Sequence, residues 1–185
     1  VSLSHSFKSA VIIENGNVTF DHIGYEGSFN SSKEENTEGI KGAIQQNGGT
    51  VMLKDCFVSS WGIGGVEDKT DYFISVTDGT LTIEGGYYPQ TGLYNKDLIH
   101  VAGENTKVYL KNVAATLDAY DRTAYFINQE AGEVTIDGGE YEAIFCLNGG
   151  QMTVKGGRFS GQLGTPKDNI GGSLHIMSAD AHLSL

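Results

Sequence analysis

The chain of 185 residues has the length of one domain and carries a formal net charge of −11, with 12 Lys and Arg against 23 Asp and Glu. This charge argues against a nucleic-acid partner, because neutralising phosphates requires clustered basic residues, and against adhesion to anionic membranes. No apolar run reaches the length of a membrane span, so we expect no membrane insertion. The 26 Gly and only 2 Pro predict many tight turns.

One sequence pattern recurs along the chain. It begins with a turn of Asn, Asp or Gly, continues as a short strand of alternating apolar and polar residues, and ends in a charged residue, a Gly pair or its substitute, and often an aromatic residue. Repetition on this scale indicates a repeat architecture. Clear copies are 47–57, 78–87, 130–141 and 148–159, and weaker copies are 15–25, 104–114 and 180–185.

A second apolar run precedes each of these turns. Each repeat, which we call a rung, therefore holds at least two short strands, and no segment has a helical period of apolar residues. Strands that recur in the same order after long return paths cannot all be antiparallel neighbours, so we predict an all-β parallel solenoid of about seven rungs. The second runs are 11–13, 43–44, 73–76, 98–101, 125–127, 144–147 and 174–176.

The connections between rungs differ in length and composition. Residues 27–39 are polar and charged, and we expect an excursion from the body. The segment 59–70 is a return path that holds the only Trp, Trp61, and 87–94 is predicted to be an aromatic-rich loop. Residues 162–172 carry the second Pro and are predicted to loop out before the last partial rung.

Aligning the copies places two columns of side chains on the outer face of the second strand of each rung, which is the strand that follows the turn. One column is rich in Thr, and the other alternates in charge at every rung. Cross-strand pairs of opposite charge stabilise neighbouring strands, so we interpret the charged column as a control of register. The columns are Thr19, Met52, Thr82, Tyr109, Thr135, Thr153 and Ser184, and Asp21, Lys54, Glu84, Lys111, Asp137 and Lys155.

The two cysteines are predicted to be buried thiols. Cys56 and Cys146 lie four rungs apart, which corresponds to about 19 Å at the spacing of stacked strands. This separation exceeds the reach of a disulfide. No His or Lys is expected beside either thiol, so neither is predicted to be reactive.

Residues 42–57, GAIQQNGGTVMLKDCF, resemble a line that recurs in bacterial right-handed parallel β-helix proteins, roughly G-G-A-I, a gap, and G-G-T-x-x-I-x-x-C-x-F. That line occurs in the pectate-lyase-like superfamily and in surface-exposed or autotransporter passenger domains. The resemblance implies a right-handed helix with three sheets, and a bacterial extracellular or cell-surface location. The chain departs from the line at Lys41, which replaces the first Gly, and no F-x-x-N repeat follows.

Enzymes of the resembled fold typically act on acidic polysaccharides through carboxylates, Ca²⁺ and an Arg or Lys. The polygalacturonase-like signatures N-T-D, D-D, G-H-G and R-I-K are absent. Acidic residues precede the first strand of successive rungs, which is the strand before the turn, and could line one groove. An alternative is that they form a solvated acidic edge interleaved with Lys69, Lys96 and Arg122. The carboxylates and their Arg are Asp68, Asp71, Asp97, Asp118, Asp121, Arg122, Glu140 and Glu142.

Two roles are open for this groove. As a catalytic site it would use Asp97, Asp118, Asp121 and Arg122, with carboxylates as an acid/base pair on a glycoside. As a Ca²⁺ site it would use oxygen ligands from Asp71, Asp97 and Asp121. Otherwise no cofactor is expected, and no zinc site is expected because His100 and His175 have no His or Cys partner at ligand spacing.

Aromatic residues near the loops suggest a different use, since sugars stack on exposed aromatic faces. We predict Trp61, Tyr88, Tyr94 and Tyr120 as ligand-binding residues on this basis. An internal aromatic stack is the expectation for the residues that follow the Gly pairs. These are Tyr25, Phe57, Tyr87, Tyr141 and Phe159.

The first functional hypothesis is a non-catalytic cell-surface or secreted module, an adhesin or stalk that binds a glycan or a host or cell-surface partner. The second is a polysaccharide lyase or glycoside hydrolase, and the third is a phage tail-spike segment, which predicts a trimer. The chain starts at Val1 without Met and ends on half a rung. We therefore interpret residues 1–185 as a single domain from a longer protein, with a continuation of the solenoid or a capping element at the C-terminal end.

Overall fold

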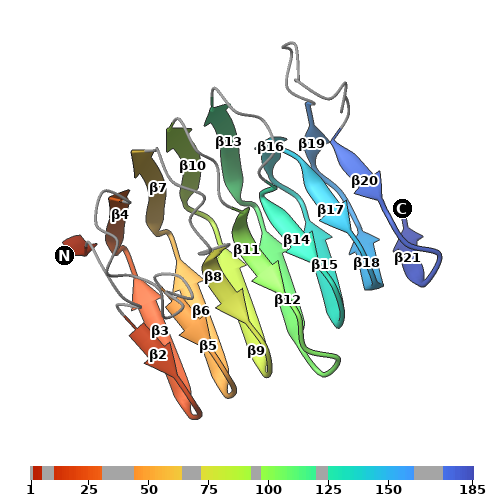
Figure 1. The fold of residues 1–185 in the computed structure, drawn as a ribbon, viewed down its shortest axis with the longest axis horizontal. Helices are drawn as coiled ribbons and strands as arrows, with labels where there is room; N and C mark the ends of the chain where they lie inside the picture. Colours follow the sequence, from red (N-terminus) through yellow and green to blue (C-terminus); the bar gives the residue numbers. More distant parts are fainter. Residues whose placement is uncertain are drawn as a thin grey trace.

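A computed structural model describes residues 2–5, 11–30, 44–63, 72–92, 97–119, 125–160 and 173–185. Every element in these ranges is a β-strand, and the strands form three sheets of seven strands each (Figure 1). All strand pairings are parallel. The predicted all-β class and parallel stacking are confirmed, and the arrangement is compatible with the predicted solenoid.

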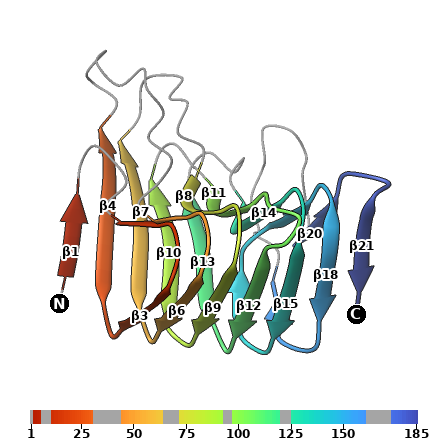
Figure 2. The same ribbon diagram turned by 90° about the horizontal axis from the view of Figure 1, so that it is seen from below.

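From β2 onward the strands follow the order sheet B, sheet C, sheet A, so each complete rung contributes one strand to each sheet. Strand β1 of sheet A precedes the first of these rungs, and the last described rung consists of β20 in sheet B and β21 in sheet C. Neighbours within a sheet therefore come from successive rungs, and the two termini lie at opposite ends of the stack (Figure 2). Sheet A consists of β1 (Ser2–His5), β4 (Gly24–Asn30), β7 (Phe57–Ile63), β10 (Tyr87–Gly92), β13 (Ala114–Ala119), β16 (Glu140–Glu142) and β19 (Arg158–Phe159). Sheet B consists of β2 (Val11–Ile13), β5 (Ile44–Gln46), β8 (Tyr72–Val76), β11 (Asp97–Val101), β14 (Ile127–Gln129), β17 (Phe145–Leu147) and β20 (Leu174–Ile176). Sheet C consists of β3 (Asn17–Asp21), β6 (Thr50–Lys54), β9 (Thr80–Glu84), β12 (Lys107–Lys111), β15 (Glu133–Asp137), β18 (Gly150–Val154) and β21 (Ala181–Ser184).

Sheet C has the register that the sequence predicts. The Thr-rich column is in register through all seven strands, from Thr19 to Ser184. The charged column is in register from Asp21 to Asp137. A slip by one rung would place like charges on neighbouring strands, which destabilises the pairing. The alternation in sign therefore favours the observed register over its nearest competitor.

Sheet A lies largely where the sequence analysis placed loops. Strand β7 occupies the first part of the segment 59–70, and β10 occupies most of 87–94. Strand β4 likewise extends to Asn30, so the excursion predicted from residue 27 is wrong over its first residues. These segments are rich in Gly, Ser and Thr and lack a long apolar run. They form strands because parallel neighbours on both sides satisfy their backbone groups.

Backbone and side-chain hydrogen bonds join the turns between sheets B and C from rung to rung. The Thr80 amide donates to the Gly49 carbonyl at 2.9 Å, and the Lys107 amide donates to the Gly79 carbonyl at 2.9 Å. The buried Gln46 side chain adds two bonds, because its Nε2 donates to Gly49 O at 3.3 Å and to Thr80 O at 3.1 Å. The turn thus holds its own rung and the next one together.

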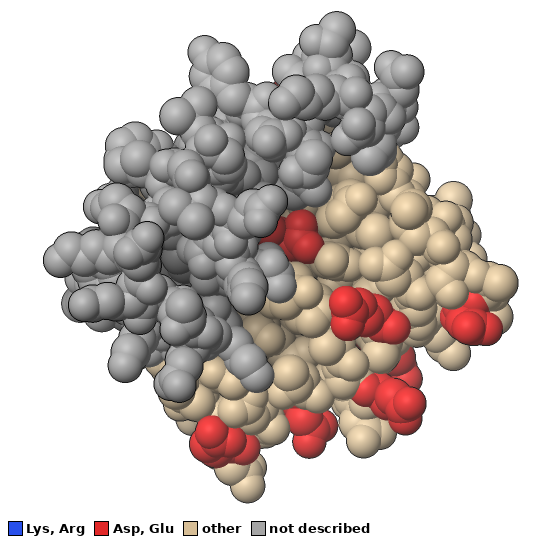
Figure 3. Space-filling model, viewed as in Figure 1, with Lys and Arg blue, Asp and Glu red and all other residues tan. Residues whose placement is uncertain are grey.

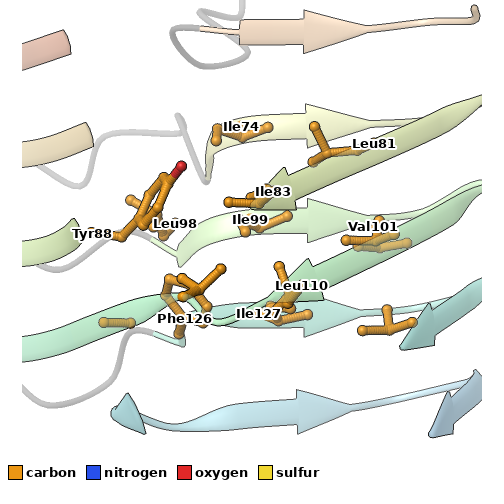
Figure 4. Close-up of a cluster of buried hydrophobic side chains, with 14 of the residues drawn as sticks. Ile74, Leu81, Ile83, Tyr88, Leu98, Ile99, Val101, Leu110, Phe126 and Ile127 are labelled. Atoms are coloured by element: carbon orange, nitrogen blue, oxygen red, sulfur yellow. The ribbon is translucent and has the colours of Figure 1, made fainter. Parts of the chain in front are cut away.

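The space between the three sheets is filled by apolar side chains (Figure 4). Aromatic rings gather at the corner where sheet A meets sheet B: Phe126 lies 5.5 Å from Phe145, 6.0 Å from Tyr141 and 6.4 Å from Tyr88 between ring centroids. The interpretation of Tyr88 as a surface, ligand-binding residue is wrong, because its side chain is 0% exposed. Alternation along β10 directs Tyr88 inward and leaves Tyr87 outside.

Replacing Tyr88 by Phe is expected to leave the free energy of unfolding unchanged or to raise it by up to about 1 kcal/mol. The reason is that the Tyr88 hydroxyl is buried and forms no hydrogen bond with any of the described residues. The matched change Tyr141→Phe should lower the free energy by about 1 kcal/mol, because the Tyr141 hydroxyl donates to Gly138 O at 3.1 Å. Urea unfolding of the two variants measures both values, and the opposite ranking would contradict this account.

Burial raises the pKa of Tyr88. Its phenol therefore ionises more easily in the unfolded chain, and its contribution to stability is complete below the ordinary pKa of about 10 and lost as the pH rises above it. We expect the wild-type protein to lose more stability than Tyr88→Phe between about pH 9 and pH 12. Equal losses in the two proteins would contradict this expectation, because they would show that the pKa of Tyr88 is the same in the folded and the unfolded chain.

Candidate functional site

The outer face of sheet A brings aromatic and charged side chains into one register. Phe57 pairs with Tyr87, Tyr87 with Ala114, Ala114 with Glu140, and Glu140 with Arg158. These side chains point away from the core, because the alternating residues Val58, Tyr88 and Tyr141 are buried. Phe57 and Tyr87 are 37% and 42% exposed, so the expectation that both belong to an internal aromatic stack is wrong.

A hollow of about 270 Å³ lies on this face, between Tyr87 at one end and Arg158 at the other. Small side chains on β13 form its floor: Ala114 lies between Tyr87 and Glu140, and Thr116 lies between Pro89 and Glu142. We call this depression the sheet A hollow. Its lining residues are Tyr87, Ala114, Ala115, Thr116, Glu140, Tyr141, Glu142, Arg158 and Ser160.

The Tyr87 ring is fixed by contacts within the sheet. Its hydroxyl forms a hydrogen bond of 2.9 Å with Thr116 Oγ1, one strand away. On its other side the Phe57 ring lies 6.0 Å away between centroids, at an interplanar angle of 49°. A ring held at both ends loses little freedom when a ligand packs against it, which favours binding.

The opposite end of the hollow is charged. Glu140 and Glu142 project from the same face of β16, and Arg158 follows on β19. Among the described residues, neither carboxylate forms an ion pair with Arg158 within 4.0 Å. The hollow therefore offers acceptor oxygens and guanidinium donors beside an aromatic ring, a combination of apolar surface and a few polar groups that suits a small polar ligand.

Asp97 has a structural role in sheet B. One carboxylate oxygen accepts a hydrogen bond of 2.7 Å from the Tyr125 amide, and the other accepts one of 2.8 Å from Asn128 Nδ2. The carboxylate thus joins its rung to the next. For the predicted catalytic set, Asp118 lies in β13 with its side chain outside the described atoms, and Asp121 and Arg122 lie outside the described residues.

The predicted Ca²⁺ set and aromatic set fall mostly outside the described part of the chain. Asp71, like Asp121, is not among the described residues, so only Asp97 of the Ca²⁺ set is placed. Within the described ranges no group of three His, Cys, Asp or Glu side chains could hold a metal ion. Trp61 lies in β7 with its side chain outside the described atoms, and Tyr94 and Tyr120 lie outside the described residues.

The outer face of sheet B carries a buried polar cluster. The His100 ring stacks on Tyr72 with centroids 3.6 Å apart, and its Nε2 lies 3.2 Å from Glu130 Oε2.

Both cysteines, Cys56 and Cys146, are buried and free, as predicted. His175, however, pairs directly with Cys146 in the register of β17 and β20, so the expectation that no His lies beside either thiol is wrong. Burial raises the pKa of the Cys146 thiol, which keeps the sulfur protonated and a poor nucleophile.

A second hollow, of about 420 Å³, lies along the turns between sheets B and C. It is lined by Glu104, Glu130, Glu133 and Asp180, and acidic side chains are visible along this side of the molecule in Figure 3. Two of these carboxylates have partners within the protein, since Glu130 contacts His100 and Glu133 lies 3.6 Å from Lys107 Nζ. The sheet A hollow is therefore the stronger candidate site.

No known protein family, curated protein or solved structure matches the chain. Among the described residues, no helix is long and apolar enough to cross a membrane. The function is therefore inferred from the residues of the sheet A hollow.

The sequence places Glu140 and Glu142 in the predicted groove, but it gives Arg158 no role and assigns Tyr87 to an internal aromatic stack. The signal was present in the repeats. Aligning the Gly pairs 85–86, 138–139 and 156–157 places Tyr87 with Glu140 and Arg158, and Tyr88 with Tyr141 and Phe159. A polar or charged residue at the first position and an aromatic residue at the second predicts which side faces solvent.

Proposed function

We propose that the protein is a bacterial right-handed parallel β-helix module of the pectate-lyase-like or autotransporter-passenger kind. It acts at the cell surface or in secreted form as an adhesin or stalk, and it binds a glycan in the sheet A hollow without catalysing a reaction. Three parallel sheets joined in a repeating order support the first part of the proposal. The placement of Tyr87 beside Glu140, Glu142 and Arg158 carries the second part.

The chemistry of the hollow suits a sugar. A pyranose ring has an apolar face of C–H groups, which packs against an aromatic ring, and its hydroxyls donate to carboxylates and accept from guanidinium. Tyr87 supplies the ring, Glu140 and Glu142 supply acceptors, and Arg158 supplies donors. The floor of Ala114 and Thr116 leaves room for the ligand.

A second candidate function is glycoside hydrolysis in the same hollow. It is favoured by one observation: Glu140 and Glu142 project side by side from β16, and glycosidases use a pair of carboxylates. The sequence-predicted catalytic role of Asp97 has less support, because both of its oxygens accept hydrogen bonds that fasten sheet B.

The proposal predicts that Tyr87→Ala weakens glycan binding by about 10-fold, which corresponds to about 1.4 kcal/mol. The purified chain is first applied to a glycan array, and affinities for the retained glycans are then measured by titration calorimetry. Tyr109→Ala is the matched control, because it removes a tyrosine from the outer face of sheet C, remote from the hollow. It should change affinity by less than about 2-fold.

Two results would contradict the proposal. Array ligands whose affinity is equal in the wild type and Tyr87→Ala would place the binding site elsewhere. Release of new reducing ends from a polysaccharide, lost in the double variant Glu140→Gln/Glu142→Gln, would instead establish the hydrolase.

A further inference from the structure

The charge of the sheet A hollow narrows the class of ligand, given the proposed glycan-binding function. Two carboxylates and one guanidinium line it, so its ionised side chains sum to −1 when Glu140, Glu142 and Arg158 are counted. The net charge of −11 on the whole chain makes the electrostatic potential at the hollow more negative. An anionic saccharide entering the hollow is therefore repelled, whereas a cationic one is attracted.

Arg158 does not neutralise its neighbours. Its strand partner in β16 is Glu140, yet among the described residues no ion pair within 4.0 Å joins them. Glu140 and Glu142 are both exposed. Their oxygens remain available to a ligand, and a donor with a positive charge would form the stronger, charge-assisted hydrogen bonds.

The spacing of these groups fits one arrangement of ligand. Residues two apart on a strand are separated by about 7 Å, so a compact ammonium with three donors can sit between Glu140 and Glu142 and donate to both. Tyr87 lies two strands from Glu140 in the same column, a distance of about 10 Å. That span suits a disaccharide, with one ring over Tyr87 and the neighbouring amino sugar between the carboxylates.

We infer that the sheet A hollow selects saccharides that carry a free amino group, such as oligomers of hexosamine, over their N-acetylated forms and over uronic acids. The aromatic end of the hollow contributes affinity that does not depend on charge, through the apolar face of a sugar ring. The carboxylate end contributes the selection. Tyr87 and the pair of glutamates therefore act separately and can be varied separately.

Three disaccharides of similar size test this inference by titration calorimetry at about pH 6, where amines are protonated. They are the β-1,4-linked glucosamine disaccharide, its N,N′-diacetyl form and digalacturonate. The free amine should bind at least about 10-fold more tightly than the diacetyl form, and digalacturonate should bind most weakly. Raising the salt from about 20 mM to about 200 mM should reduce the preference for the amine.

In the double variant Glu140→Gln/Glu142→Gln the preference should disappear, so that the amine and the diacetyl form bind with affinities within about 2-fold of each other. Glu84→Gln/Asp137→Asn on the outer face of sheet C is the control for the loss of two negative charges. Equal affinities for the amine and diacetyl forms, or tighter binding of digalacturonate, would overturn the inference while the proposed glycan-binding function stands. Failure of all three disaccharides together with a blank glycan array would instead refute the proposed function.

Discussion

Gly79→Ala is expected to lower the free energy of unfolding by about 4 kcal/mol, which is enough to abolish folding in a protein of marginal stability. Gly79 has a φ of +87°, a conformation that costs an L-residue about 1–2 kcal/mol. In addition, a Cβ at this position would lie 2.3 Å from Gly49 O in the preceding rung and 2.9 Å from Gly49 N. Gly49 O also accepts the hydrogen bond from the Thr80 amide, so relieving the clash disrupts the joint between rungs.

Gly16→Ala separates the two contributions. Gly16 occupies the same place in its turn and has a φ of +92°, but a Cβ there would meet no atom of the described part of the chain within 4 Å. Only the conformational cost of about 1–2 kcal/mol should appear. Urea unfolding measures the difference between the variants, and equal losses would contradict the close stacking of rungs at this corner.

Phe126→Ala is expected to lower the free energy of unfolding by about 3–5 kcal/mol. The Phe126 side chain is 0% exposed, and its ring contacts Tyr88, Tyr141 and Phe145. It therefore lies at the centre of the aromatic cluster that joins sheets A and B, and its removal leaves a cavity that the surrounding strands cannot close without leaving their register.

Phe126→Leu is the control, since it keeps most of the buried volume and should cost less than about 2 kcal/mol. The measurement is the midpoint of urea unfolding, with the slope unchanged if the native state is intact. A loss below about 1 kcal/mol for Phe126→Ala would show that the cluster is looser than the structure has it.

The sequence predicts sheet C well because two independent signals coincide there. The alternation of apolar and polar residues fixes the face of each strand, as at Val51 and Leu53. The turn residues before each strand and the alternating charges from Asp21 to Lys111 then fix its neighbours. Each of these is a local pattern, so it is visible in a single chain.

Sheet A is harder to predict because its strands follow the Gly pairs and carry no common alternation. Tyr87-Tyr88-Pro89-Gln90 has the composition of a loop, yet β10 pairs with β13 through its whole length and with β7 at both of its ends. The stability of such a strand comes from its neighbours in other rungs, and its own residues contain little of that information. The resemblance to three-sheeted proteins anticipated the third sheet, which periodicity alone did not.

The candidate site could likewise be predicted from the sequence only in part. The acidic residues Glu140 and Glu142 could be noted from the sequence, but their assembly with Tyr87 depends on the register of three strands contributed by successive rungs. From the sequence, Tyr88 is predicted to bind a ligand and Tyr87 to lie inside, whereas in the structure Tyr87 is exposed and Tyr88 is buried. The two predictions are wrong by one residue, which on a strand reverses the face. The hollow itself arises because β13 presents Ala114 between larger neighbours, which only the alignment of neighbouring strands reveals.

The most direct test of the account is to locate a bound saccharide by amide chemical shifts, with the glucosamine disaccharide or the best array glycan as the titrant. The account predicts shifts at Tyr87, Thr116, Glu140, Glu142 and Arg158, which line the sheet A hollow. It predicts none at Tyr109 or Lys111 on sheet C. Saturable shifts on another face, with Tyr87 and Glu142 unmoved, would contradict it.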